Sequence, residues 1–202
     1  MNMRYILFIL GFLFYTLPVN AAPLMQYTAT VLTTQGGQTS GGKMYVDNNK
    51  IRVEAKVQSQ EVYSIVRPDL GKLFSVIPSQ KVYTEIPISE NDIKMITPYS
   101  ADVALTAVGD EKINGQDCTK YKMDQIEGTV YLWLNKKTQA PVQMTAEETG
   151  MKTEWQNLKV GAPAAKLFEP PLGYQKLDIP EEAATQLNQN KASKKSKKNN
   201  ND

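Results

Sequence analysis

The sequence predicts a mainly β fold: about eleven strands in one curled antiparallel sheet, an open half-barrel, with one or two short helices. Three observations lead to this expectation. Apolar and polar residues alternate repeatedly between residues 23 and 175, which is typical of half-buried strands. Turn residues interrupt these runs at short intervals, as at Gly36-Gly37 and Asn114-Gly115. Only two short stretches carry helical signals.

Each expected strand is an alternating run between two turns. In residues 51–57 (IRVEAKV) apolar side chains alternate with charged ones, and residues 129–134 (TVYLWL) place aliphatic and aromatic side chains on opposite faces. Runs of this kind place strands near residues 24–34, 42–47, 50–57, 61–67, 72–77, 81–87, 103–110, 116–124, 129–135, 141–148 and 151–160.

The short connections between these runs predict how the strands pair. A parallel pair needs a crossover of about a dozen residues or more, so neighbouring strands are expected to run antiparallel, as one meander. Strand twist then curls a sheet of this size. The glycine-rich residues 36–42 lack the lysine and the following helix of a phosphate-binding loop, and we interpret them as a hairpin loop.

The two helical signals are brief. Ser89 and Asp92 have the spacing of a capping box, and Pro98 ends the apolar edge that follows. Residues 164–168 predict a single turn, which Pro170 and Pro171 close.

The two ends of the chain are expected to lie outside the fold. Arg4, the uncharged residues 5–17 and the small residues before Ala22 have the pattern of a signal peptide (1–21), cleaved after Ala21. That apolar run is too short for a bilayer core, which needs roughly 20 residues. The folded domain is expected over residues 22–178. Residues 179–202 are rich in lysine and poor in apolar residues, which predicts a disordered tail.

Composition excludes several kinds of chemistry. The chain has no histidine and one cysteine, Cys118, so it cannot form a Ser-His-Asp relay, a histidine-built metal site or an internal disulfide. The adjacent acids Asp110-Glu111 and Glu147-Glu148 diverge on strands, unlike the opposed carboxylates of a glycosidase. We therefore expect no enzyme, no catalytic residue, no metal and no cofactor.

Three stretches carry a resemblance to a known family. They are residues 42–54 (GKMYVDNNKIRVE), residues 71–83 (GKLFSVIPSQKVY) and residues 164–174 (AAKLFEPPLGY). In this order they resemble the LolA/LolB-like superfamily of outer-membrane lipoprotein carriers, and more closely an uncharacterised exported family related to it. The resemblance implies a half-barrel whose concave side holds acyl chains, and a periplasmic protein that binds lipid or lipidated protein.

The candidate binding residues are apolar strand positions. We expect them to form an apolar wall for acyl chains, because ligand pockets are mostly apolar; a closed core is the alternative interpretation of the same residues. The twelve residues are Met44, Val46, Ile51, Val53, Phe74, Val76, Val82, Ile86, Val130, Leu132, Leu134 and Met144.

The expected function is that of a periplasmic, non-enzymatic binding protein for lipid or lipidated protein, acting as a carrier or a chaperone. The alternative is an envelope sensor or protein-interaction module that uses a sheet edge or the convex face. The lysine-rich tail is a candidate contact with anionic membrane. Nucleic acid is not an expected partner.

Overall fold

A computed structural model describes residues 25–90, 92–93, 104–125 and 128–178. The expected signal peptide and lysine-rich tail lie outside the described residues. Alternating side chains form one sheet of twelve strands, which are β1 (Gln26–Gln35), β2 (Gln38–Asp47), β3 (Lys50–Val57), β4 (Gln60–Arg67), β5 (Lys72–Ile77), β6 (Val82–Pro87), β7 (Thr106–Ile113), β8 (Gln116–Gln125), β9 (Gly128–Asn135), β10 (Pro141–Ala146), β11 (Met151–Val160) and β12 (Gln175–Leu177). The predicted mainly β, open and largely antiparallel sheet is confirmed.

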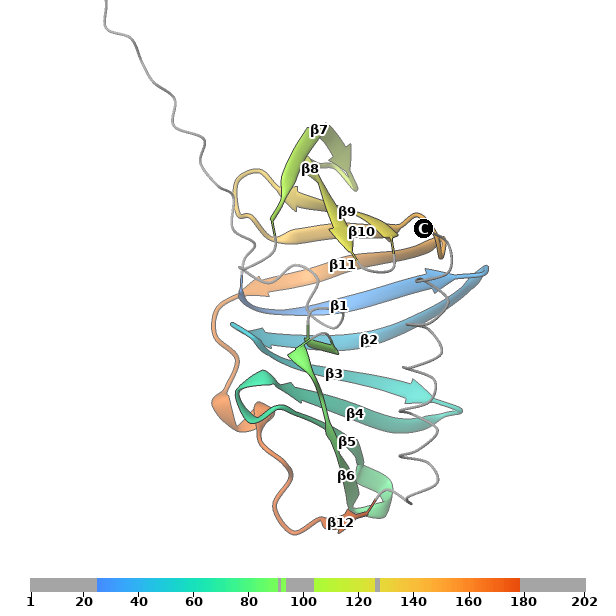
Figure 1. Cartoon of the computed structure of the whole chain (residues 1–202), viewed down its shortest axis with the longest axis vertical. Helices are drawn as coiled ribbons and strands as arrows, with labels where there is room; N and C mark the ends of the chain where they lie inside the picture. Colours follow the sequence, from blue (N-terminus) through green and yellow to red (C-terminus); the bar gives the residue numbers. More distant parts are fainter. Residues whose placement is uncertain (1–24, 91, 94–103, 126–127, 179–202) are drawn as a thin grey trace, which may run out of the picture.

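The strand order corrects the single meander. The sheet runs β12-β6-β5-β4-β3-β2-β1-β11-β10-β9-β8-β7, so two meanders, β1–β6 and β7–β11, meet where β1 pairs with β11 (Figure 1). Strands β6 and β7, which are consecutive in the chain, therefore lie toward opposite ends of the sheet. Short connections predict antiparallel neighbours within each meander, but they say nothing about this pairing between distant strands.

Two further expectations differ from the structure. The interval after Gly37 is not a loop, because β2 begins at Gln38 and pairs with β1 along its whole length. The short strand β12 was not predicted, and it pairs with β6 in parallel. The long excursion from β11 to β12 supplies the crossover that such a parallel pair requires.

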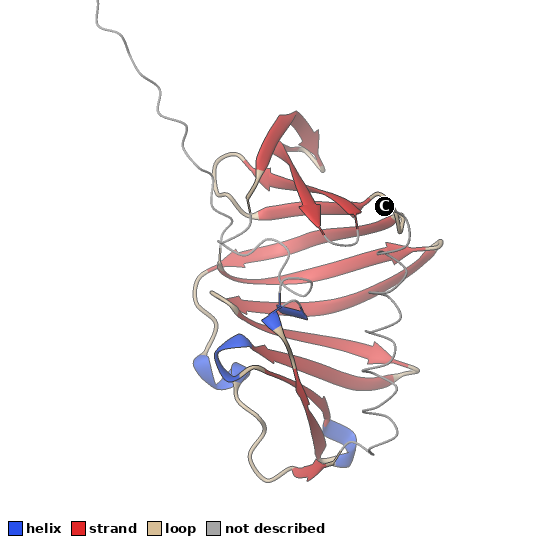
Figure 2. Cartoon of the chain, in the orientation of Figure 1, coloured by secondary structure: helices blue, strands red, loops and turns tan. Residues whose placement is uncertain are grey.

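The first helical signal lies largely outside the described residues, of which Glu90, Asp92 and Ile93 are helical, and the second gives a short 3-10 turn (Figure 2). The 3-10 turns η1 (Pro68–Leu70), η2 (Pro78–Gln80) and η3 (Ala165–Phe168) follow strands, and η3 is the expected turn before the proline pair. At Ser89 the capping box forms: the Ser89 backbone N–H donates to Asp92 Oδ2 at 2.8 Å, and the Asp92 N–H donates to Ser89 Oγ. Within the described residues, no helix has the length and apolarity needed to cross a membrane.

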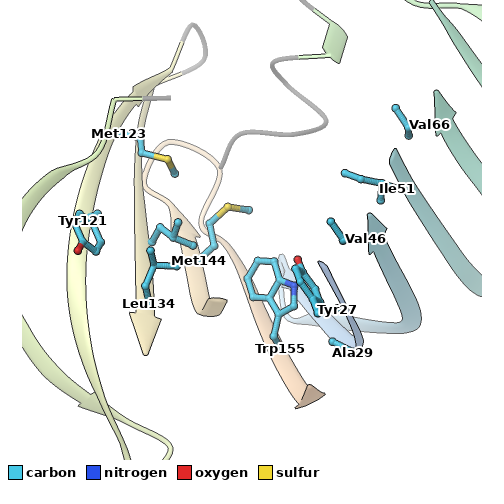
Figure 3. Close-up of a cluster of buried hydrophobic side chains, with 11 residues drawn as sticks. Tyr27, Ala29, Val46, Ile51, Val66, Tyr121, Met123, Leu134, Met144 and Trp155 are labelled. Carbon is cyan, nitrogen blue, oxygen red and sulfur yellow. The ribbon is translucent and has the colours of Figure 1, made fainter. Parts of the chain in front are cut away.

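Alternation gives the sheet two distinct faces. We call inner the face that carries the inner cluster, whose buried members are Tyr27, Ala29, Val46, Ile51, Val66, Tyr121, Met123, Leu132, Leu134, Met144 and Trp155. Figure 3 shows Tyr27, Ala29 and Trp155 between side chains of β8–β10 and side chains of β2–β4. The inner cluster therefore joins the two meanders.

Residues 161–174, which we call the strap, pack against the opposite, outer face through Leu167, Phe168 and Tyr174. Phe168 of the strap is fully buried against the outer cluster, which contains Tyr45, Ile65, Phe74 and Val76. Arg67 is buried and holds the strap: it donates to Phe168 O at 3.1 Å, to Glu169 Oε1 at 2.8 Å and to both oxygens of Asp69. Arg52 donates to Leu167 O at 3.2 Å.

Candidate functional site on the inner face

One part of the inner face is filled by the protein's own side chains. Tyr27, Leu132 and Leu134 are fully buried, and Val46 and Met123 nearly so. Ile88 and Leu105, which lie at the two ends of the connection between β6 and β7, pack against this cluster. This part of the inner face is a packed core that joins the two halves of the sheet.

A second part of the inner face, over β1–β4, is only half-buried. Val31, Gly42, Ala55 and Val62 are successive cross-strand partners, so they form one row across four strands. With Val53 and Val57 they form what we call the trough. Its members are half-buried except Val57, which is 56% exposed at the end of β3.

A glycine allows two strands of the trough to lie close together. Gly42 is needed at its position because a Cβ there would lie 2.5 Å from the backbone oxygen of Glu54 on β3. The charged residues of β3 occupy alternate positions on the other face. Two of them, Arg52 and Glu54, form an ion pair there at 2.9 Å. The side chains that β3 offers to the trough are therefore apolar.

Methionines border both parts of the inner face. Met123 and Met144 are buried in the inner cluster, and Met44 and Met151 pack against it half-buried. The Tyr27 hydroxyl lies 3.8 Å from the Met44 sulfur. Because the methionine side chain is flexible and polarizable, it can repack around contacts of varied shape.

The twelve predicted wall residues fall into three groups. Val46, Ile51, Leu132, Leu134 and Met144 are buried in the inner cluster, and Met44, Val53 and Val130 pack against it half-buried. Val82 and Ile86 are half-buried, and their pairing with Ile77 and Leu73 places them on the inner face. Their role in binding stays a prediction.

Phe74 and Val76 do not lie on the inner face. Both belong to the outer cluster under the strap. Strand β5 is apolar on both faces, since Leu73 and Phe74 are neighbours, and the sequence does not reveal which face a distant segment covers. Conversely, four residues that lie on the inner face were absent from the predicted wall, although they continue the same alternation. They are Val31, Ala55, Val57 and Val62.

The outer face of β7–β9 holds a polar and aromatic group. Lys120 Nζ lies 4.5 Å from the Tyr131 ring centroid and 4.9 Å from that of Trp133, and the Trp133 indole N–H donates to Glu111 at 3.0 Å. These contacts are those of cross-strand packing. Among the described residues, no three acidic or cysteine side chains gather as a metal site would require.

The single cysteine lies beneath this group. Cys118 is fully buried, and its thiol contacts the Gln116 backbone oxygen at 3.4 Å. Burial is the largest effect on its pKa, which it raises. The thiol therefore stays protonated at neutral pH, the form that is a poor nucleophile.

Comparison with known proteins gives a family and a fold. The family described as a domain of unknown function, DUF4412, matches residues 29–140. An uncharacterised conserved protein of Thermus thermophilus has a similar structure, with a TM-score of 0.56, 14% identity, and coverage of 77% of this chain and 91% of that chain. That similarity indicates a shared fold. No curated protein sequence matches the chain.

Two further structures are more distant. The MucA/MucB complex of Pseudomonas aeruginosa gives a TM-score of 0.47 at 14% identity, over 76% of this chain and 58% of that chain. A LolA superfamily protein of Nitrosomonas europaea gives 0.40 at 13% identity, over 73% and 91%.

Proposed function

We propose that this chain, which belongs to the DUF4412 family, is an exported, non-enzymatic protein that binds lipid or lipidated protein on the inner face of its sheet. In this proposal the signal peptide is removed after Ala21 and the protein works in the periplasm. Acyl chains lie in the trough over β1–β4, against Val31, Val53 and Val57. The inner cluster serves as the fixed wall beside them.

The observation that supports this proposal is an apolar face that is only partly filled. A fully packed core would leave no space for a ligand, whereas in the trough valines of three strands remain in contact with water. Each CH₂ group moved from water onto such a surface contributes about 0.8 kcal/mol. An acyl chain that buries ten of them gains about 8 kcal/mol before the entropic cost of binding.

The methionines support the same proposal. Met44 and Met151 are half-buried beside the inner cluster, and Met44 is the cross-strand partner of Val53 in the trough. Side chains of this kind accept acyl chains of different length and saturation without a fixed pocket shape. The sequence resemblance to lipoprotein carriers implies the same class of ligand.

The test is uptake of a fluorescent fatty acid, cis-parinaric acid, by the delipidated mature protein. Two exposed valines provide matched variants: Val57→Glu places a charge in the trough, and Val108→Glu places one on β7, where Val108 is 48% exposed. We expect saturable uptake by the wild type and by V108E, with at least tenfold weaker uptake by V57E. Native mass spectrometry of protein from periplasmic extract should show a copurified lipid mass. Equal uptake by both variants, or none by the wild type, contradicts the proposal.

A further inference from the structure

The pairing of β10 with β11 stops before β11 ends. Its last pair is Gln143 with Glu154, while β11 continues to Val160 and pairs on its other side with β1. Between Trp155 and Val160, β11 therefore has no pairing with β10. A β-bulge opposite Ala29, where Asn157 has a φ of 51°, bends the strand in the same interval.

A cavity of about 490 Å³ lies against this strand edge. Its far wall is formed by the start of β10, the turn before it and the turn between β7 and β8. Its polar lining includes Asn114, Gln116, Asn135, Glu154, Gln156 and Asn157. The cavity is separate from the trough, with which it shares no residue.

Five of the lining side chains are carboxamides, each with two donors and an acceptor. Two of them have fixed orientations: Asn135 Nδ2 donates to Gln116 Oε1 at 3.0 Å, and Asn135 Oδ1 accepts the N–H groups of Lys137 and Thr138. The one charged lining residue, Glu154, is paired with Lys152 at 3.1 Å. Apart from the Glu154 carboxylate, the polar side chains that line the cavity are uncharged.

The backbone of β11 adds a second set of hydrogen-bonding groups. The Gly161 N–H donates to Gln26 O on β1 at 3.0 Å. Because successive N–H groups of an extended chain point to opposite sides, the Val160 N–H points away from β1, toward the side that β10 leaves open. A strand edge beside carboxamides is complementary to a peptide backbone, which presents donors and acceptors in the same alternation.

We propose that this cavity binds an extended, uncharged polypeptide segment of a partner protein, which adds to the open edge of β11 as a strand. The carboxamides of Gln156 and Asn157 contact the same segment. A saccharide would engage the carboxamides but has no means of continuing a strand ladder. The peptide site does not depend on lipid binding in the trough.

The first measurement uses an array of capped hexapeptides containing all combinations of valine, threonine, asparagine and glutamine. The strongest binder is then titrated into the ¹⁵N-labelled mature protein. We expect saturable shifts of the Gln156 to Val160 amide signals. The same peptide N-methylated at alternate residues keeps its side chains but loses the donors of one edge, and it should bind at least tenfold more weakly.

Two proline variants supply the matched control. Val160→Pro removes an N–H from the proposed edge, and Val108→Pro removes one from an exposed valine of β7; circular dichroism checks that both fold. We expect at least tenfold weaker peptide binding by V160P, with V108P and V57E unchanged. The proposal is overturned if no hexapeptide binds, if the N-methylated peptide binds equally, or if maltotriose, and not peptide, shifts the β11 amides.

Discussion

Arg67 is the residue that most directly fastens the strap to the sheet. Its guanidinium is buried and donates to two carboxylates and a backbone oxygen. We expect Arg67→Ala to lower the free energy of unfolding by about 2 kcal/mol, since charge-assisted hydrogen bonds are lost and a buried site is left incomplete. Arg67→Lys should recover only part of the lost free energy, because an ammonium group lacks the planar, forked arrangement of donors that arginine has. Urea unfolding of both variants measures the difference.

A matched control for Arg67 is the partly exposed pair of Lys72 and Glu85 at 2.8 Å. Such pairs contribute about 0–1 kcal/mol, so Lys72→Ala should cost less than Arg67→Ala. Equal losses in the free energy of unfolding would mean that burial does not strengthen the contacts of Arg67.

The ion pair between Arg67 and Asp69 makes the stability of the protein depend on pH. Hydrogen bonds from Arg67 are the main cause that lowers the pKa of the Asp69 carboxyl below its ordinary value of 3.8. A carboxyl with a lowered folded pKa stabilises the protein above its unfolded pKa, and this contribution is lost as the pH falls through the folded value. Asp69→Asn should therefore flatten the loss of stability between neutral and strongly acidic pH. Urea unfolding at several pH values across that range measures the free energy of unfolding of both proteins. If this free energy falls equally steeply with pH in both, the prediction is wrong.

At the scale of elements, the strap is the segment whose packing is easiest to test. Phe168 of η3 is fully buried, whereas Leu172, four residues later, is 99% exposed. Phe168→Ala should lower the free energy of unfolding by about 3–5 kcal/mol because it leaves a cavity in the outer cluster. Leu172→Ala should change it by no more than about 0.5 kcal/mol. Thermal unfolding measures both variants. Equal losses of stability would mean that the strap does not pack as described.

The strands show what alternation can predict. Residues 50–57 and 72–77 were predicted with the observed bounds because turns mark both ends of each run. In residues 50–57 charged residues also mark one face. The start of β2 was missed because Gln38 to Gly42 contain no apolar residue, and pairing with β1 determines their conformation. Strand β12 was missed because its three exposed residues form a strand only beside β6.

The candidate site was predicted in part for a similar reason. Met44, Val53 and Val130 reach the inner face because they alternate with polar residues on amphipathic strands. Phe74 and Val76 alternate equally well, yet the strap covers them from the other side. The cavity beside β11 could not be predicted, because it depends on where the pairing of β10 ends and not on any local sequence pattern.

At the scale of the whole molecule, β1 and β11 hold the two meanders together. They pair over most of their length, and Tyr27 and Trp155 fill the inner cluster between the halves. We expect the amide hydrogens that bond β1 to β11 to exchange only through global unfolding, and those of β12, whose residues are all exposed, to exchange fastest among the strands. Hydrogen exchange read by NMR measures both. Faster exchange along β1 than global unfolding allows would indicate that the two meanders separate from each other before the whole domain unfolds.

The position of β1 also determines an order of events during synthesis. Residues 26–35 emerge early, but their second partner strand, residues 151–160, is among the last parts of the sheet to be made. Until then one side of β1 is an open edge, and its apolar residues remain exposed to other nascent chains. Unprotected edges of this kind favour aggregation. The growing chain is therefore most vulnerable after residue 35 has emerged and before residue 160 has followed.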